Sequence, residues 1–303
     1  MPMTQTTDLA DTIPTIIEEA QFTRQFKGVM RGLSWNVRKG KGSTVNIPYF
    51  NTATSHQLTE GIDMTTSEKM EDTNVQVTPY EAGLKIILTK NVVEDDNEDL
   101  IRAAGRLLGD GYELKVDQDL LARLDNATVS LGGASTTLTM GQVAAARSLL
   151  SGNAVSSGGP APMPYVAVHH PFATLDLVDI LTPIIPTRES ASSGYQAPGG
   201  AAMMNDVLAN YAIGRLFGMN WVEDGNLSID SSDDAKGGVF AAGMNGGILY
   251  CPAREPTIEM DGGGNGYDAS LRGWELVYVG RYGVGNYLNG WTVELYNDCL
   301  TPA

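Results

Sequence analysis

The sequence predicts an α+β fold in which an extended β-hairpin loop leads into a long helix. Two strand-like segments, residues 44–50 and 74–89, flank residues 51–73, which are mostly polar and show neither a helical nor a strand period. An acid-rich stretch at residues 94–99 then precedes leucines at three- and four-residue steps, as in an amphipathic helix. The second half of the chain holds most of the excess glycine and mixes short helical patterns with strand-like alternation.

The extended loop, residues 38–85, has little use in a self-sufficient domain. A two-stranded ribbon is marginal in water because it cannot bury a face by itself, and long loops without regular structure are uncommon unless they serve a purpose. Six of the loop's apolar side chains are candidates for an interface: Tyr49, Phe50, Leu58, Ile62, Met64 and Met70. Aromatic and methionine residues are favoured at interface cores, so we expect burial between subunits; the alternative is a loop that folds back on its own domain. This pattern indicates a subunit that builds a lattice.

The long helix is predicted from about Glu94 to Asn126, a length of about 45 Å. Its apolar face consists of Leu100, Ala104, Leu107, Leu108, Leu114, Leu121 and Leu124. Gly105, Gly109 and Gly111 interrupt the pattern, and each costs about 1 kcal/mol relative to alanine in a helix interior. Three such glycines indicate close packing, a bend or a variable curvature, so they are our candidates for flexibility of this helix.

The remaining elements follow from local signals. Residues 1–37 predict an N-terminal arm with one short amphipathic helix around Ile16 and Ile17. Thr139 is the expected N-cap of a helix over 140–151, and a buried strand at 165–170 precedes a helix that opens with Pro171. Another helix is expected at 201–214. Strands are expected at 215–224, 239–251 and 256–260, and residues 274–298 predict two or more antiparallel strands joined by turns.

The formal charge of −16 argues against a protein whose main task is to grip nucleic acid, because that task needs clustered Lys and Arg. The single dense basic stretch, residues 38–42, is interpreted as the root of the extended loop rather than as a nucleic-acid site. No apolar run has the length needed to cross a bilayer, and the N-terminus lacks a signal-peptide pattern. We therefore expect neither secretion by the usual route nor a membrane span.

Candidate chemical sites are weak. Cys251 and Cys299 are expected to be reduced and partly buried, since they lie far apart in apolar contexts. His169 and His170 are adjacent, so on a strand they point to opposite faces and cannot readily share a metal. The third histidine, His56, lies in the extended loop. No catalytic, cofactor or metal-binding residue is predicted.

Two glycine- or acid-rich segments resemble calcium sites only superficially. Residues 263–268 match one unit of a glycine-rich calcium repeat, but a single copy has no neighbour to complete the ion's coordination, so a turn is expected. Residues 224–234 have calcium-like chemistry without the EF-hand spacing, so a solvated loop is expected.

The order of elements resembles the major capsid proteins of tailed bacteriophages, with the Hong Kong 97-type fold. The resemblance covers nearly the whole chain from about residue 25. It lies in the extended loop, in TKNVVEDDNED at the entry to the long helix, in VDQDLLARLDNA at its end, and in YVAVHHPFATLDLVDIL, GRLFGMNWVED and YGVGNYLNGWTVELYND. None of these motifs is catalytic. Their number and order carry the resemblance.

The resemblance implies four parts: an N-terminal arm (1–37), the extended loop (38–85), a peripheral domain (86–138, completed by about 270–303) and an axial domain (139–269). It implies hexamers and pentamers in an icosahedral shell around double-stranded DNA, a virion location, assembly in the host cytoplasm, a separate scaffolding protein and a portal. Cement or decoration proteins are left open. Some members join subunits by a Lys–Asn bond, but no motif pairs Lys69 with an asparagine, so none is expected here.

Three alternatives remain at this stage. The chain could be a decoration protein or another virion structural protein that binds a shell without forming it. It could be a compartment of the same fold that encloses cargo enzymes, as encapsulins do. It could also be a soluble homo-oligomeric enzyme whose site is not recognisable from sequence.

Overall fold

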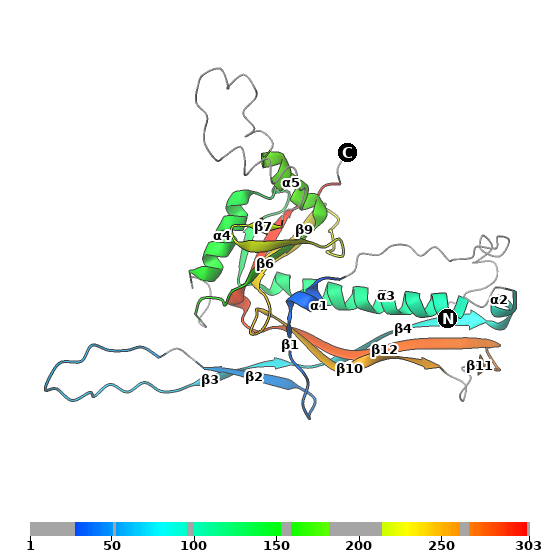
Figure 1. Cartoon of the computed structure of the whole chain (residues 1–303), viewed down its shortest axis with the longest axis horizontal. Helices are drawn as coiled ribbons and strands as arrows, with labels where there is room; N and C mark the ends of the chain where they lie inside the picture. Colours follow the sequence, from blue (N-terminus) through cyan, green and yellow to red (C-terminus); the bar gives the residue numbers. More distant parts are fainter. Residues whose placement is uncertain are drawn as a thin grey trace, which may run out of the picture.

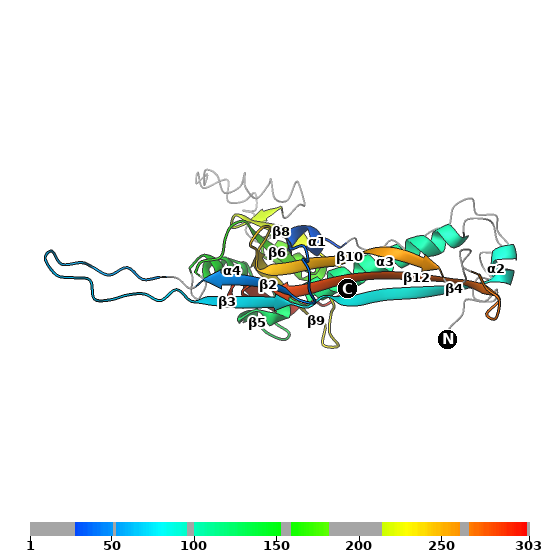
Figure 2. The ribbon, with the colours of Figure 1, turned by 90° about the horizontal axis from the view of Figure 1, so that it is seen from below.

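The computed structural model describes residues 28–50, 53–95, 100–152, 159–181, 214–260 and 267–301. Figure 1 shows an elongated sheet with a long helix along it, a second sheet with helices at one end, and a hairpin that projects from the body. The turned view in Figure 2 shows that the hairpin and the long sheet follow the same axis. The predicted mixture of helices and sheets is confirmed.

The first sheet has five strands. β10 (Ile248–Met260), β12 (Gly273–Asn286) and β4 (Tyr80–Thr89) are long neighbours, while β1 (Trp35–Asn36) pairs with β10 and β11 (Tyr267–Asp268) with β12. The helices α2 (Lys90–Asp95) and α3 (Leu100–Leu121) follow β4, and α3 packs on β4 and β12. The predicted strand at 256–260 is the end of β10, which shifts register around Pro252 and Arg254.

The second sheet has six strands in the order β5-β13-β9-β6-β8-β7. Their bounds are β5 Val129–Gly132, β6 Tyr165–His169, β7 Arg215–Leu216, β8 Met219–Glu223, β9 Asp234–Ala241 and β13 Thr292–Asp298. The helices α4 (Met140–Ser151) and α5 (Pro171–Leu181) belong to this end of the molecule. Thr139 forms the expected cap, because its side chain accepts from the Gln142 N–H and the Gln142 side chain accepts from its N–H.

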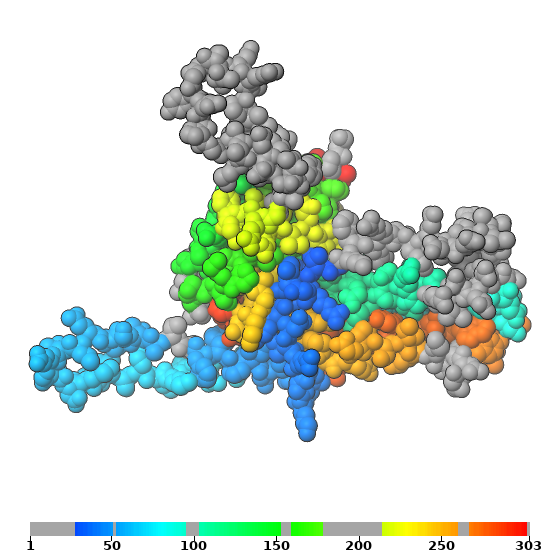
Figure 3. All heavy atoms as spheres, viewed as in Figure 1, coloured from blue at the N-terminus to red at the C-terminus, as the bar shows by residue number. Residues whose placement is uncertain are grey.

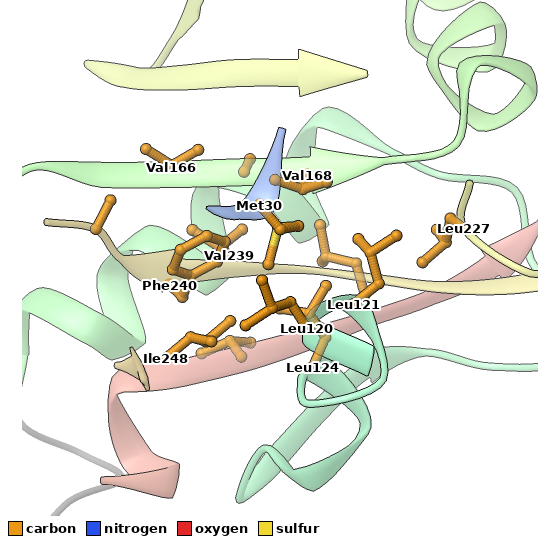
Figure 4. Packing of buried hydrophobic residues seen from close by; sticks show 14 of the residues in the cluster. Met30, Leu120, Leu121, Leu124, Val166, Val168, Leu227, Val239, Phe240 and Ile248 are labelled. Carbon is orange, nitrogen blue, oxygen red and sulfur yellow. The ribbon is translucent and has the colours of Figure 1, made fainter. Parts of the chain in front are cut away.

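The main core lies where α1 (Met30–Leu33), the end of α3 and the second sheet meet. Figure 4 shows Met30 converging with Leu120, Leu121 and Leu124, and with Val168 and Phe240 from the second sheet. All six side chains are buried. This packing fixes the helix relative to both sheets.

The long helix is shorter than predicted. Instead of one helix from Glu94 to Asn126, α2 ends at Asp95, α3 ends at Leu121, and a separate 3₁₀ turn spans Leu124–Asn126. The last turn tightens, since the Arg123 N–H donates to the Leu120 carbonyl three residues earlier. Ala104, Leu108, Leu121 and Leu124 of the predicted face are buried, but Leu107 is 47% exposed.

Residues 274–298 were predicted to form two or more antiparallel strands joined by turns, and they form two strands that do not pair with each other. β12 pairs with β10 and β4 in the first sheet, whereas β13 pairs with β9 and β5 in the second. A 3₁₀ turn at Asn289–Trp291 separates them. Alternation predicts a strand but does not specify its partner, so the division between two sheets could not be predicted. The predicted helices around Ile16 and at 201–214, and most of residues 263–268, lie outside the described residues.

Candidate assembly surface

The hairpin consists of β2 (Val45–Phe50) and β3 (Asp72–Val77), paired antiparallel from Val45 opposite Val77 to Phe50 opposite Asp72. Its root packs on the body. Val77 is buried with Leu249 and Cys251, and Ile47 contacts the same cluster. The Tyr49 ring lies edge-on to Tyr287, with centroids 6.0 Å apart. Tyr49, one of the six predicted interface residues, therefore contacts its own chain.

Beyond this root, the tip of the hairpin, residues 53–71, is exposed throughout. Figures 1 and 3 show it extending from the body without a neighbour. Gly61, with φ +80°, forms the turn, and the Ile62 N–H donates to the Thr59 carbonyl. The other five predicted interface residues are between 56% and 77% exposed: Phe50, Leu58, Ile62, Met64 and Met70. The tip does not fold back on its own domain, and its burial on another subunit stays a prediction.

A hydrogen-bond network holds the junction between the hairpin and β4. The hydroxyl groups of Tyr80 and Tyr282 both donate to Asp119 Oδ2 on α3, the second at 2.6 Å. Arg281 donates through Nε and Nη2 to the Pro79 carbonyl, each at 3.3 Å. Burial alone would raise the pKa of Asp119, but hydrogen bonds from Lys115, Tyr282 and Tyr80 lower it overall. The direction of the hairpin is thus tied to the long helix.

The three glycines of the long helix differ in their surroundings. A Cβ at Gly105 or Gly109 would meet nothing within 4 Å, whereas one at Gly111 would lie 3.1 Å from Leu84 Cδ1. Close packing therefore explains Gly111 alone. The flexibility suggested for Gly105 and Gly109 stays a prediction.

Residues 28–30 are held next to α3 by buried aspartates. Asp117 Oδ1 accepts from the Met30 N–H at 3.1 Å, and Asp117 Oδ2 accepts from Asn226 Nδ2 at 2.9 Å. Asp224 lies beside them and is 1% exposed. A Cβ at Gly28 would lie 2.5 Å from Asp117 Cγ, so glycine permits this close approach. Residues 28–30 are therefore clamped onto α3.

The acidic segment 224–234 is only partly the solvated loop expected. Asp230 is exposed and accepts from the N–H groups of Ser232 and Asp234, but Asp224 and Asp234 are buried. A pocket of about 330 Å³ lies between this loop and the end of α3. Lys236 at its edge pairs with Asp125 and Glu294. Lys236 Nζ lies 3.7 Å from Glu294 Oε1, which receives no hydrogen bond from a described group.

The remaining candidate residues are structural. His169 is fully buried, which lowers its pKa to about 4, and its Nδ1 accepts from the His170 N–H. Cys251 and Cys299 are free, as predicted, and are fully rather than partly buried. Within the described ranges, no group of His, Cys, Asp and Glu side chains is arranged to hold a metal ion. In the same ranges, no helix has the length and apolar character needed to cross a membrane.

Sequence reasoning missed Asp117, Asp119 and Asp224. A signal existed for Asp117, since it lies four residues before Leu121 and seven before Leu124, on the predicted apolar face. No local pattern identifies Asp119 or Asp224, because their partners Tyr282 and Asp117 are distant in sequence.

Both the sequence and the fold are similar to those of known proteins. A model of a family described as phage capsid protein matches residues 71–293. The capsid structure of cyanophage P-SCSP1u is similar with a TM-score of 0.67 and 13% identity, over 94% of this chain and 93% of that chain. The capsid structure of Helicobacter pylori bacteriophage KHP30 has a TM-score of 0.69 at 10% identity, over 99% of both chains. A structure from Mycobacterium phage Che8 has a TM-score of 0.67 at 15% identity, over 93% of this chain and 95% of that chain.

A search of curated protein sequences gives no match. The structural similarities confirm the capsid fold, and the family match extends over most of the chain. Because that match covers residues 71–293 of 303, the chain belongs to the phage capsid protein family and is a major capsid protein, the subunit of a virion shell.

Proposed function

We propose that the chain assembles into hexamers and pentamers of an icosahedral shell around double-stranded DNA, and that its extended loop joins neighbouring subunits. The observation that carries this proposal is the projecting tip, residues 53–71, whose large apolar side chains are all more than half exposed. Covering them on a neighbour contributes roughly 25 cal/mol per Å² of apolar area. Repetition of this contact around a closed shell gives stability by avidity.

The net charge of −16 supports a shell that encloses DNA without gripping it. The partners in this proposal are other copies of the chain, a separate scaffolding protein and a portal, with assembly in the host cytoplasm. Shape and charge together suit a structural subunit, and the proposal assigns the chain no catalytic step.

The first test measures the size of the particles that the chain forms. The chain is purified alone and with a candidate scaffolding protein, then studied by sedimentation and negative-stain electron microscopy. Shells, or rings of five and six, support the proposal, whereas a monomer or dimer under both conditions contradicts it. Binding to preformed shells without self-association would identify a decoration protein, and packaged protein instead of DNA would identify a cargo compartment.

A second measurement examines the tip directly. A variant with Leu58, Ile62, Met64 and Met70 all changed to serine should stay folded as a monomer, because these side chains are exposed, but should lose assembly. A matched control changes the polar tip residues Ser55, Thr59, Thr65 and Thr66 to alanine and should assemble normally. Equal loss in both variants would show that the apolar side chains are not the contact.

A further inference from the structure

The turn that joins β1 to the hairpin carries a basic group that has no partner in the described part of the chain. Arg38 and Lys41 are exposed and Lys39 is half-buried, and none of them lies within ion-pair distance of a described carboxylate. A Cβ at Gly40 or Gly42 would meet nothing within 4 Å, so this turn, residues 38–43, stands clear of the body. Figure 3 shows it in blue, projecting from the rest of the molecule.

The tip of the hairpin has the opposite charge. Between residues 53 and 71 it carries one lysine and the four carboxylates Glu60, Asp63, Glu68 and Glu71. The lysine, Lys69, pairs with Glu71 at 2.8 Å, and Glu68 lies 3.4 Å from His56. Glu60 and Asp63, at the end of the tip, are exposed and have no described cationic partner.

The basic turn and the acidic tip are too far apart to meet within one chain. About 16 residues of extended backbone separate the base of β2 from Gly61, which spans roughly 50 Å. The hairpin therefore projects well beyond the body of its own chain, as Figure 1 shows, and its tip lies where an adjacent copy would stand. When copies repeat around a ring in the same orientation, the tip of one copy reaches the root of the next.

We propose that the basic turn, residues 38–43, is the docking site for the acidic tip of the extended loop of a neighbouring copy, centred on Glu60 and Asp63. The inference rests on the proposed self-assembly and adds its register and direction. Opposite charges at the two ends of the loop favour head-to-tail contacts and disfavour head-to-head ones, because like charges would then face each other. The apolar tip residues contribute buried surface area to the contact, and the charges favour its head-to-tail orientation.

A charge exchange tests this pairing. One variant carries Arg38→Glu and Lys41→Glu, a second carries Glu60→Lys and Asp63→Lys, and a third combines all four changes. Each of the first two should assemble about tenfold more slowly or worse, while the combined variant should recover rings or shells. A control with Glu223→Lys and Glu259→Lys, exposed carboxylates outside the loop, should assemble as the unchanged chain does. Circular dichroism and thermal unfolding of each variant confirm that folding is intact.

A crosslinking experiment measures whether position 41 of one copy lies close to position 63 of another. Chains with Lys41→Cys are mixed with chains with Asp63→Cys and treated with a short bis-maleimide. Crosslinked dimers should form in the mixture and not in either variant alone, since the native cysteines are buried. Dimers of a single variant, or none in an assembled mixture, would overturn the head-to-tail pairing.

The outcomes separate the two proposals. If the unchanged chain never self-associates, the proposed function fails and the pairing with it. If it assembles but the reversal variants assemble equally well, the pairing alone is wrong. Shells of the Arg38→Glu, Lys41→Glu variant that form normally but retain less DNA would assign the basic turn to nucleic acid and would likewise refute the pairing.

Discussion

Asp117 and Asp224 bring two buried carboxyl groups together beneath the backbone that leads to Met30. The pKa of Asp224 is raised to about 7. Burial is the larger cause, and the interaction with the Asp117 side chain is the second. Asp224 Oδ2 has no hydrogen-bond partner among the described groups, so a proton on Asp224 removes the repulsion between the two carboxylates. The folded state is therefore favoured when Asp224 is protonated.

This arrangement predicts a pH-dependent stability. The folded state holds a proton on Asp224 between pH of about 4 and 7, whereas the unfolded state has lost it, so the free energy of unfolding falls as pH rises through this range. Asp224→Asn keeps a donor to Asp117 without a titrating proton. It should raise the melting temperature by a few degrees at pH 8 and change it less at pH 5. Thermal unfolding of the disassembled chain measures this, with the exposed Asp63→Asn as control; parallel pH profiles of wild type and Asp224→Asn would contradict it.

The Asp119 network predicts the opposite pH direction. The pKa of Asp119 is lowered, so its contribution to stability is present at neutral pH and is lost as pH falls through the folded-state value. Asp119→Asn should cost about 1.5–3 kcal/mol at pH 7, because two tyrosine hydroxyls lose a charged acceptor. Denaturant unfolding should show this difference shrinking toward pH 3. A difference that stays constant with pH would mean that the charge on Asp119 does not contribute.

Tyr112 and Gly280 make a steric prediction about the contact between α3 and β12. A Cβ at position 280 would overlap the Tyr112 ring, so glycine is required for the helix to approach the sheet. Gly280→Ala should destabilise the fold by about 1–3 kcal/mol, as expected for overpacking. Denaturant titration of the monomer measures this loss. Gly40→Ala, where open space surrounds the backbone, serves as the matched control.

Gly105 and Gly109 allow a test of helix flexibility. Because their surroundings are open, alanine at each site should stabilise the isolated chain by about 0.5–1 kcal/mol through helix propensity alone. If variable curvature of α3 matters in assembly, the variant with alanine at 105, 109 and 111 should form precursor shells that expand slowly or incompletely. Electron microscopy of shell diameter measures the expansion. Normal precursors and normal expansion would remove flexibility as the reason for these glycines.

Much of the fold was predictable because its signals are local. The cap at Thr139, the buried strand β6 and the start of α5 at Pro171 all follow from residues within one turn or one strand. The projection of the hairpin followed from the absence of periodicity in residues 51–73. Ile62 and Met64 are exposed, so they are free to pack on another subunit, but that burial stays a prediction.

By itself, the sequence determined the kinds and order of the elements, the projecting loop with its apolar and charged side chains, and the lack of a recognisable catalytic motif. Only the tertiary structure decided that β12 and β13 enter different sheets, that Tyr49 packs on Tyr287, and that Asp117 meets Asp224. The physical reason is the separation in sequence between the residues that interact. Helix and strand periods arise from neighbouring residues, whereas strand partners and buried polar pairs depend on which distant surfaces pack together.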